Sequence, residues 1–270
     1  MSDQFNEIID DLAGEHAALE AVLVSMSEDE FNTPSHAPGW LARDQVAHLA
    51  FFDEAAARAI SNPEAFIEEG KAATNPEVNQ EARYLQRGRE MTVEGLLNWW
   101  RTASRDLIAA ARTVDPKARL PWYGPPMSGV SFITARLMET WSHGLDVVDV
   151  VRAERPDTDR LRHVAFIGVR TRPFSYANRG MQMPETPVRV ELTSPSGATW
   201  ILGDESASDC ISGSATDFCR VVTQRRHLAD TTLVVKGPAA EEWMSIAQAF
   251  AGPPGGGRKP GEFADEAARA

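Results

Sequence analysis

Positively charged residues are scarce in this chain of 270 residues. Its 27 Lys and Arg stand against 39 Asp and Glu, which gives a formal net charge of −12. Nucleic-acid-binding proteins carry basic clusters, so this balance argues against nucleic acid as a partner. The sequence also lacks a run of eighteen apolar residues, which argues against a membrane span. We therefore expect neither nucleic acid nor a membrane among its partners.

Cysteine is equally sparse. Cys210 and Cys219 do not form a CxxC pair, and two buried thiols in a reducing compartment are the simplest interpretation. The first twenty residues form an acidic amphipathic pattern rather than a basic segment followed by an apolar run, so no signal peptide is evident. These features favour a soluble cytoplasmic protein.

Helical periodicity dominates the chain up to about residue 152. Apolar residues recur every three or four positions in four long runs, over 5–23, 41–60, 93–111 and 131–152. Four such helices with polar connections are typical of a four-helix bundle. The connections over 62–91 and 115–130 are long. The Pro- and Gly-rich stretch LPWYGPPMSG (120–129) is expected to be an irregular loop at the open end of the bundle.

The pattern changes after Glu154-Arg155-Pro156. A helix is predicted near 158–172, followed by period-two alternation over 188–193 and a strand over 199–203. Ser214 and Asp217 resemble a capping box that opens a helix over 215–226. TTLVVKG predicts a strand, and a last helix ends near residue 250. The predicted fold class is therefore α followed by α+β: a four-helix bundle over 1–152, a small α+β domain over 158–251 and a flexible tail over 252–270.

The stretch RLMETWSHGLDVVDV (136–150) places polar groups in an otherwise apolar helix. Glu139, His143 and Asp146 fall on one stripe, and the opposite side is apolar as well, so this helix is expected to be buried on both sides. Buried polar groups need partners. His48 lies close to the apolar face of the helix predicted over 41–60, and we expect it to point into the bundle.

One partner that suits these groups is a metal ion. His48 from one helix, with Glu139 and His143 as an i,i+4 pair from another, is workable geometry for a metal in a bundle core. Two imidazoles and one carboxylate leave coordination positions open, as a catalytic site requires. Zinc and iron both accept this donor set. Asp146 would accept a hydrogen bond from an imidazole N–H.

The alternative is a satisfied polar network, in which Glu139 pairs with Arg136 and the histidines bond to hydroxyls. Spacing alone does not choose between the two. His16 lies on the apolar stripe of the first helix, where it is a fourth ligand, a pocket-lining residue or a core histidine, of which the last is commonest. His36, His163 and His227 have no comparable setting, so surface or hydrogen-bonded roles are expected for them.

Two segments carry a family resemblance. FNTPSHAPGWLARDQVAHLAFFDEAA resembles the Pro-Gly-Trp, Asp and Val-Ala-His-Leu signature of the mycothiol-dependent maleylpyruvate isomerase and DinB-like superfamily. RLMETWSHGLDVVDV is similar to the signature of that family's fourth helix. The resemblance implies that His48, Glu139 and His143 bind a divalent metal, usually zinc, and that mycothiol is a thiol cosubstrate. ISGSATDFCRVVTQRRHLADTTLVVKG is similar to the small sterol-carrier-like domain that accompanies the bundle.

The sequence departs from the isomerase pattern in two places. The family's C-terminal helix often ends in Gly-Arg, whose Arg helps to form the isomerase active site, whereas this chain has Gln224-Arg225 followed by Arg226. We expect one of these arginines to face the metal and the other to be exposed. TRPFSYANRGMQMP (171–184) lies outside the isomerase pattern and suggests a subgroup known mainly as metal-binding proteins.

The resemblance therefore implies a metal-dependent enzyme that uses mycothiol for S-transfer to, or cis–trans isomerisation of, an electrophile of the maleylpyruvate type. A metal favours the nucleophilic thiolate. Arg225 or Arg226 would dock a substrate carboxylate, and Trp122 and Tyr123 would wall the cleft. The alternatives are a metal-dependent hydrolase without thiol and a non-catalytic metal-binding protein. The expected partners are a small-molecule substrate and the thiol.

Overall fold

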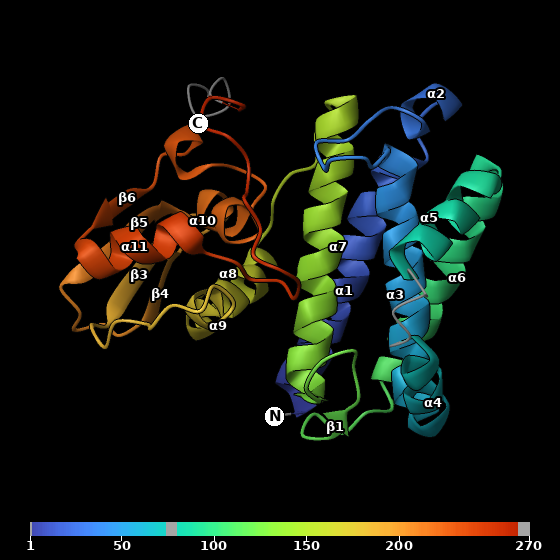
Figure 1. The fold of residues 1–270 in the computed structure, drawn as a ribbon, viewed down its shortest axis with the longest axis horizontal. Coiled ribbons are helices and arrows are strands. Elements are labelled where there is room, and N and C mark those ends of the chain that lie inside the picture. Colours follow the sequence, from blue (N-terminus) through green and yellow to red (C-terminus); the bar gives the residue numbers. More distant parts are fainter. Residues whose placement is uncertain (1, 74–79, 264–270) are drawn as a thin grey trace. The chain divides into compact units, whose positions relative to one another are not determined.

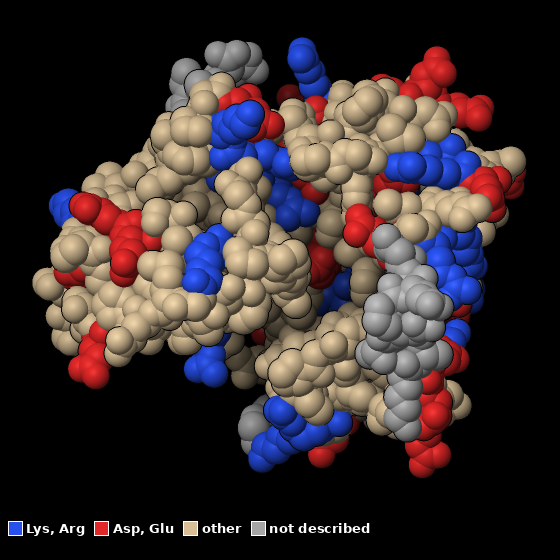
Figure 2. Space-filling model, viewed as in Figure 1, with Lys and Arg blue, Asp and Glu red and all other residues tan. Residues whose placement is uncertain are grey.

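The protein was analysed as a computed structural model that describes residues 2–73 and 80–263. The chain divides into two compact units, Met1–Arg155 and Pro156–Ala270. The N-terminal unit is helical, and the C-terminal unit combines a sheet with helices (Figure 1), which confirms the predicted order of α followed by α+β. On the face shown in Figure 2, acidic and basic side chains are interspersed over both units. Within the described residues, no helix is long and apolar enough to cross a membrane.

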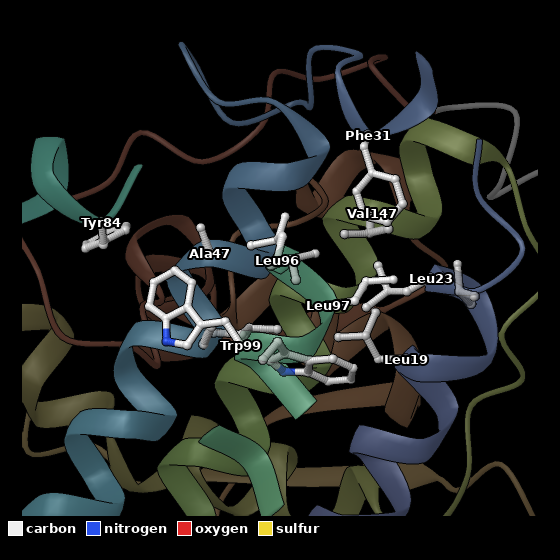
Figure 3. Close-up of a cluster of buried hydrophobic side chains, with 14 residues drawn as sticks. Leu19, Leu23, Phe31, Ala47, Tyr84, Leu96, Leu97, Trp99 and Val147 are labelled. Atoms are coloured by element: carbon white, nitrogen blue, oxygen red, sulfur yellow. The ribbon is translucent and has the colours of Figure 1, made fainter. Parts of the chain in front are cut away.

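Four long helices form the frame of the N-terminal unit: α1 (Ser2–Leu23), α3 (Ala42–Ser61), α6 (Val93–Ala111) and α7 (Gly129–Val151). They match the four predicted runs to within a few residues. α3 packs against both α6 and α7, and α1 packs against α7. The apolar stripes of these helices meet in a buried core that includes Leu19, Leu96 and Val147 (Figure 3). The short helix α2 (Glu28–Phe31) begins at the capping residue Ser27 and buries Phe31 in the same core.

The segment expected to be a long connection, 62–91, contains two further helices. These are α4 (Pro63–Ala73) and α5 (Gln80–Glu90). α5 was missed because its sequence, QEARYLQRGRE, is mostly polar and offers few apolar residues to mark a buried face. It nevertheless packs closely on α3, because a Cβ added at Gly88 would lie 2.5 Å from the Cβ of Ala47. A small residue at this point therefore lets the two backbones approach.

The Pro- and Gly-rich loop before α7 is irregular, as predicted, except for a minimal hairpin. β1 (Arg119–Leu120) pairs antiparallel with β2 (Met127–Ser128). Ser128 then caps α7 by accepting a hydrogen bond from the backbone N–H of Ser131 at 3.2 Å. The cap fixes the start of the helix that carries Glu139 and His143.

The C-terminal unit contains one four-stranded sheet with the order β4-β3-β5-β6. Its strands are β3 (Val188–Thr193), β4 (Thr199–Gly203), β5 (Asp209–Ser214) and β6 (Val234–Lys236). β3 and β5 are parallel, and the other two pairs are antiparallel. The helices are α8 (Leu161–Arg170), α9 (Arg172–Ala177), α10 (Ala215–Val222), the short 3₁₀ helix η1 (Leu228–Asp230) and α11 (Pro238–Ile246). β5 was not predicted, because its residues do not alternate between buried and exposed positions.

Two further expectations for the C-terminal unit differ from the structure. The helix capped by Ser214 ends at Val222 rather than at residue 226, because Gln224 adopts a positive φ of 59° that a helix does not continue through. Residues 252–263, expected to be a flexible tail, are bound to the unit. Asp230 accepts hydrogen bonds from the backbone N–H groups of Gly261 and Phe263. Residues 264–270 of the expected tail lie outside the described residues.

Candidate metal centre

Two neighbouring helices supply the three residues of the candidate site. His48 lies on α3, and Glu139 and His143 lie one turn apart on α7. The first turn of α3 is fixed by Asp44, whose carboxylate accepts a hydrogen bond from the backbone N–H of Leu41 at 2.8 Å. One turn further along, the imidazole of His48 reaches the facing side of α7.

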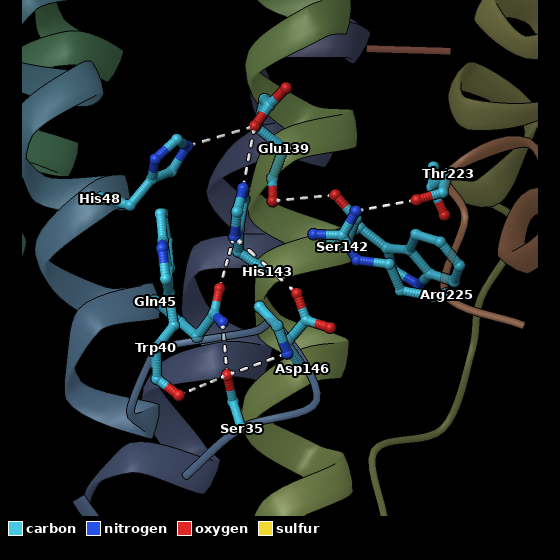
Figure 4. Close-up of polar contacts among 12 residues, drawn as sticks. Ser35, Trp40, Gln45, His48, Glu139, Ser142, His143, Asp146, Thr223 and Arg225 are labelled. Carbon is cyan, nitrogen blue, oxygen red and sulfur yellow. Dashed lines mark hydrogen bonds and ion pairs between the residues drawn. The ribbon is translucent and has the colours of Figure 1, made fainter. Parts of the chain in front are cut away.

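The three side chains meet at one carboxylate oxygen (Figure 4). The Oε2 atom of Glu139 lies 3.3 Å from Nε2 of His48 and 3.1 Å from Nε2 of His143. One ligand atom from each residue lies within 4.8 Å of the others. The side chains are partly buried, with exposed fractions of 14% for His48, 20% for Glu139 and 12% for His143. The structure therefore brings together the three residues that the sequence proposed as metal ligands.

The remaining nitrogen of His143 bonds to a residue that sequence reasoning missed. Its Nδ1 lies 2.6 Å from Oε1 of Gln45, whereas the Asp146 carboxylate is 3.9 Å away. The expectation that Asp146 would hold this imidazole is therefore wrong, because the ring of His143 turns from its own helix toward α3. Gln45 lies three residues before His48, on the same side of α3. A buried amide in that apolar stripe was the signal that could have identified it.

Aromatic rings surround the two histidines. Nδ1 of His48 lies 3.3 Å from the hydroxyl of Tyr84 on α5. The indole of Trp40 stacks on His143, with ring centroids 6.0 Å apart and an interplanar angle of 18°. Its Nε1–H donates to Glu81 at 2.9 Å. Trp40 also lines a cavity of about 520 Å³ between residues 38–40 and α5. Tyr84 was missed because it belongs to the polar helix that the sequence did not predict.

The pKa values follow from burial and from the shared oxygen. Burial, and after it the neighbouring His143, lower the pKa of His48 to about 3, although the hydrogen bond to Glu139 and its charge act in the opposite direction. Burial alone would raise the pKa of Glu139, but the hydrogen bonds from His143 and His48 hold it well below its usual range. At neutral pH His48 is therefore a neutral base and Glu139 an anion, which are the protonation states that bind metal.

A second buried network lies on the same two helices. Nε of Arg136 on α7 lies 3.0 Å from Oδ1 of Asp53 on α3, and Nε2 of His16 lies 3.3 Å from Oδ2 of the same carboxylate. The pairing of Arg136 with Glu139 that the alternative network required is therefore replaced by a pairing with Asp53. His16 lies edge-on to Trp100, at 5.9 Å between ring centroids. It belongs to this network and is not among the three residues of the metal cluster.

The aromatic residues of the 120–129 loop connect to the cluster through one ring. Phe52, one turn after His48 on α3, lies 4.6 Å from the His48 ring. The rings of Trp122 and Tyr123 lie 6.0 Å and 5.9 Å from Phe52. Tyr123 is exposed and Trp122 partly so. The two loop residues thus extend an aromatic surface that begins beside a candidate ligand.

Arg225 and Arg226 follow α10 in the C-terminal unit. The guanidinium of Arg226 lies over the ring of Phe263, 3.6 Å from its centroid, and only 3% of the residue is exposed. Arg225 is partly buried and donates to the backbone carbonyl of Thr223 at 2.8 Å. The expectation that one arginine would be solvent-exposed is not met, because Phe263 covers Arg226 and Arg225 is partly buried. A role for either arginine toward the bundle site stays a prediction.

The other three histidines stand apart from the cluster. The hydrogen-bonded role expected of His163 and His227 agrees with the structure, in which His163 Nε2 lies 3.4 Å from Nε of Arg162 and His227 caps η1. His36 is partly buried and is not a member of the cluster either.

A helical bundle with a two-histidine, one-glutamate cluster, followed by an α+β unit, defines a DinB-like protein with a candidate metal site. Residues 12–148 match the model of the mycothiol maleylpyruvate isomerase N-terminal domain, and the chain belongs to this family. The family resemblance seen in the sequence is thereby confirmed.

The chain is also similar to other proteins and to solved structures. Two uncharacterized proteins from two strains of Mycobacterium tuberculosis are each 42% identical over 251 residues, which covers 92% of this chain and 96% of theirs. A crystal structure of the mycothiol-dependent maleylpyruvate isomerase has a TM-score of 0.57 at 16% identity and covers 87% of this chain and 95% of that one. A histidine-to-alanine mutant of that enzyme gives the same TM-score at 17% identity, over 82% and 90% of the two chains. At this identity the likeness shows the fold.

Proposed function

We propose that this protein is a metal-dependent enzyme that uses a low-molecular-weight thiol of the mycothiol type. The thiol either transfers to an electrophilic substrate of the maleylpyruvate type or catalyses its cis–trans isomerisation. The observation that carries the proposal is the convergence of both Nε2 atoms, of His48 and His143, on one oxygen of Glu139. The names of the solved proteins with this fold support the choice of thiol and substrate type.

The residues present fit a divalent metal. Two imidazole nitrogens and a carboxylate oxygen are ligands that zinc commonly takes, and three protein ligands leave a position open for a substrate. His48 is held neutral and Glu139 anionic, so neither has to lose a proton first. The second nitrogen of each imidazole has its own partner, Gln45 or Tyr84, as metal-binding histidines usually do.

A bound divalent cation would supply positive charge that favours the thiolate form of a thiol beside it. Trp40 and Phe52 shield the faces of the ligand rings from water. The cavity beside Trp40 offers room for the body of the thiol. The aromatic surface of Trp122 and Tyr123 would hold the electrophile.

The thiol can act on the substrate in either of two ways. In isomerisation, the thiolate sulfur adds to a carbon of a conjugated cis double bond, the new single bond rotates, and the C–S bond breaks to restore the double bond as trans. The thiol is then regenerated. In S-transfer, the C–S bond is kept, and either the neighbouring carbon of the former double bond takes up a proton or a leaving group departs from the attacked carbon, so one thiol is consumed for each product.

A substrate carboxylate requires a cation, and we assign this role to Arg225. The guanidinium of Arg226 is covered by Phe263, whereas Arg225 is only partly buried. A guanidinium binds a carboxylate through two parallel hydrogen bonds, which fixes the orientation of the substrate as well as its position.

The first test is elemental analysis of purified protein. We expect about one equivalent of divalent metal in the wild type and in the control His163→Ala, whose histidine lies outside the cluster. His48→Ala, Glu139→Ala and His143→Ala should each lose the metal. Retention of full metal content in all three ligand variants would contradict the site.

The second test measures chemistry with and without mycothiol, using a maleylpyruvate-type electrophile. Turnover that needs both metal and thiol supports the proposal, and the amount of thiol consumed separates S-transfer from isomerisation. Hydrolysis of esters or amides without thiol would instead establish a metal-dependent hydrolase. Metal binding with neither activity would leave a non-catalytic metal-binding protein.

A further inference from the structure

A chain of hydrogen bonds runs from the loop before α3 to the candidate ligand His143 (Figure 4). The hydroxyl of Ser35 donates to the backbone carbonyl of Trp40 at 3.0 Å. The side-chain NH₂ of Gln45 donates to the Ser35 oxygen at 2.9 Å. The Gln45 carbonyl oxygen then lies 2.6 Å from Nδ1 of His143. The chain therefore links a loop carbonyl to the imidazole in three steps.

In this series of hydrogen bonds, each group can act only as a donor or only as an acceptor toward its neighbour. A backbone carbonyl accepts and never donates, so the single hydroxyl proton of Ser35 is directed at Trp40. The Ser35 oxygen is then an acceptor, and it takes the NH₂ group of Gln45, which only donates. This fixes the amide with its carbonyl oxygen toward His143. Because that oxygen only accepts, Nδ1 of His143 has to carry a proton.

We propose that Gln45 is a positioning residue that holds His143 in the tautomer with the proton on Nδ1, and that Ser35 sets the amide orientation of Gln45. The inference rests on the proposed metal site and adds the residues that prepare it. With the Nδ1 proton directed at Gln45, Nε2 of His143 is the nitrogen that can exchange its contact with Glu139 Oε2, 3.1 Å away, for a bound metal. Gln45 is fully buried, so water does not compete for the bond.

His48 is held differently. Its Nδ1 meets the hydroxyl of Tyr84, and a hydroxyl both donates and accepts. Either tautomer of His48 satisfies this contact. His143 is therefore the pre-oriented ligand, and His48 is the ligand that changes its tautomer to suit what binds.

The consequence of losing Gln45 follows from the contact with Glu139. Without Gln45, the Asp146 carboxylate lies 3.9 Å from Nδ1, beyond hydrogen-bonding distance, so the neutral His143 ring keeps its proton on Nε2, bonded to the Glu139 oxygen 3.1 Å away. That arrangement occupies two of the three ligand atoms with each other. Loss of such an orienting partner typically weakens metal binding by about 10–100-fold.

The test compares zinc affinities, measured by competition with a chromophoric chelator. Gln45→Leu keeps the volume but removes the acceptor, so the dissociation constant should rise by about 10–100-fold. Gln45→Glu keeps an oxygen at the same place and should remain within a few-fold of the wild type. Ser35→Ala frees the amide to flip and should give a smaller rise than Gln45→Leu. Gln4→Leu, the same substitution at an exposed position on α1, is the control and should leave the dissociation constant unchanged.

A second readout does not depend on metal or activity. In metal-free protein labelled with ¹⁵N-histidine, two-bond ¹H–¹⁵N correlations report which ring nitrogen carries the proton. We expect a protonated Nδ1 on His143 in the wild type and in Gln45→Glu, and an Nε2–H tautomer in Gln45→Leu. This measurement stands even if Gln45→Leu fails to fold, because the wild-type spectrum alone decides the tautomer.

The two readouts separate the positioning role from the metal site itself. Protonated Nδ1 with loss of that state in Gln45→Leu supports the inference, whether or not the wild type binds zinc. An unprotonated Nδ1 on His143 in wild-type protein would overturn it, even if zinc binds. Equal zinc affinities of the wild type and folded Gln45→Leu would overturn it as well.

Discussion

The buried pair of Arg136 and Asp53 offers the sharpest test of how the bundle divides its polar residues between stability and function. Arg136 is 4% exposed and Asp53 is fully buried, and the ion pair between them spans 2.9 Å from Nη2 to Oδ1. Burial alone would raise the pKa of Asp53, but Arg136 and then His16 lower it overall, so the carboxylate is ionised in the folded state. Replacing Arg136 by Met leaves this charge in an apolar core with only His16 as a partner.

The expected cost follows from the uncompensated charge. Removing one partner of a buried ion pair typically destabilises by about 3–5 kcal/mol. For a unit of about this size, 1 kcal/mol shifts the melting temperature by about 2–4 °C, so Arg136→Met should lower it by roughly 6–20 °C. Asp53→Leu should cost a similar amount because it strands the guanidinium. The double variant, Asp53→Leu with Arg136→Met, should recover most of the loss, because it strands neither charge.

The assay is urea and thermal unfolding of the wild type, the two single variants and the double variant. A chelator is present in every sample, so that metal binding does not contribute to stability. Metal content is then measured separately at a temperature where all four are folded. Because Arg136 bonds to Asp53 rather than to Glu139, Arg136→Met should still bind metal with the wild-type stoichiometry. Additive single effects, with no recovery in the double variant, would refute the reasoning. Loss of metal from folded Arg136→Met would show that Arg136 supports Glu139 after all.

Three further predictions follow from the same contacts. The pKa of His48 falls from its ordinary 6.5 to about 3 on folding, so between these two pH values the unfolded chain binds a proton that the folded chain does not. The stability of the metal-free protein should therefore fall as the pH drops from 6.5 toward 3. The urea midpoint should depend less on pH in His48→Gln than in the wild type, and an equal pH dependence would contradict this. Arg225→Ala should keep its metal but lose roughly 30–1000-fold in the rate of the thiol reaction, seen in steady-state kinetics; an unchanged rate would remove Arg225 from the site. Gly88→Leu should force α5 away from Ala47 on α3 and expose Tyr84, which intrinsic tyrosine fluorescence or hydrogen exchange would detect; unchanged protection of α5 would argue against close packing there.

The sequence predicted most of the frame of the bundle because its long helices bury wide apolar stripes. Apolar residues recur over several turns in each of the long helices α1, α3, α6 and α7. This periodicity can be recognised in the local sequence, without knowing which helices pack together. α5 has too few apolar residues to mark such a stripe. It contacts α3 through a glycine and a few larger residues, so its existence depends on packing that the local sequence does not display.

The candidate ligands were predictable for a similar reason, whereas their supporting residues were not. Glu139 and His143 share one helix, and their spacing alone shows that they lie on one side. The partner of His143 comes instead from the facing helix, as Gln45, and the partner of His48 comes from α5, as Tyr84. Periodicity identifies neighbours along one helix, but cross-helix partners depend on the rotation and offset of packed helices. Asp146 was therefore the natural but wrong choice.

The two polar networks differ in how their charge is balanced, and this difference explains why only one of them suits a metal. Arg136 and Asp53 neutralise each other inside the bundle, with His16 completing the contacts of the carboxylate. In the other network, two imidazoles point at one oxygen of an ionised Glu139, and burial keeps His48 neutral at physiological pH. Breaking the balanced pair should destabilise the bundle, whereas a cation added to the second network should bind where the carboxylate charge and the imidazole nitrogens already converge. Substitutions in the cluster should therefore change binding more than folding, and substitutions at Arg136 or Asp53 should do the reverse.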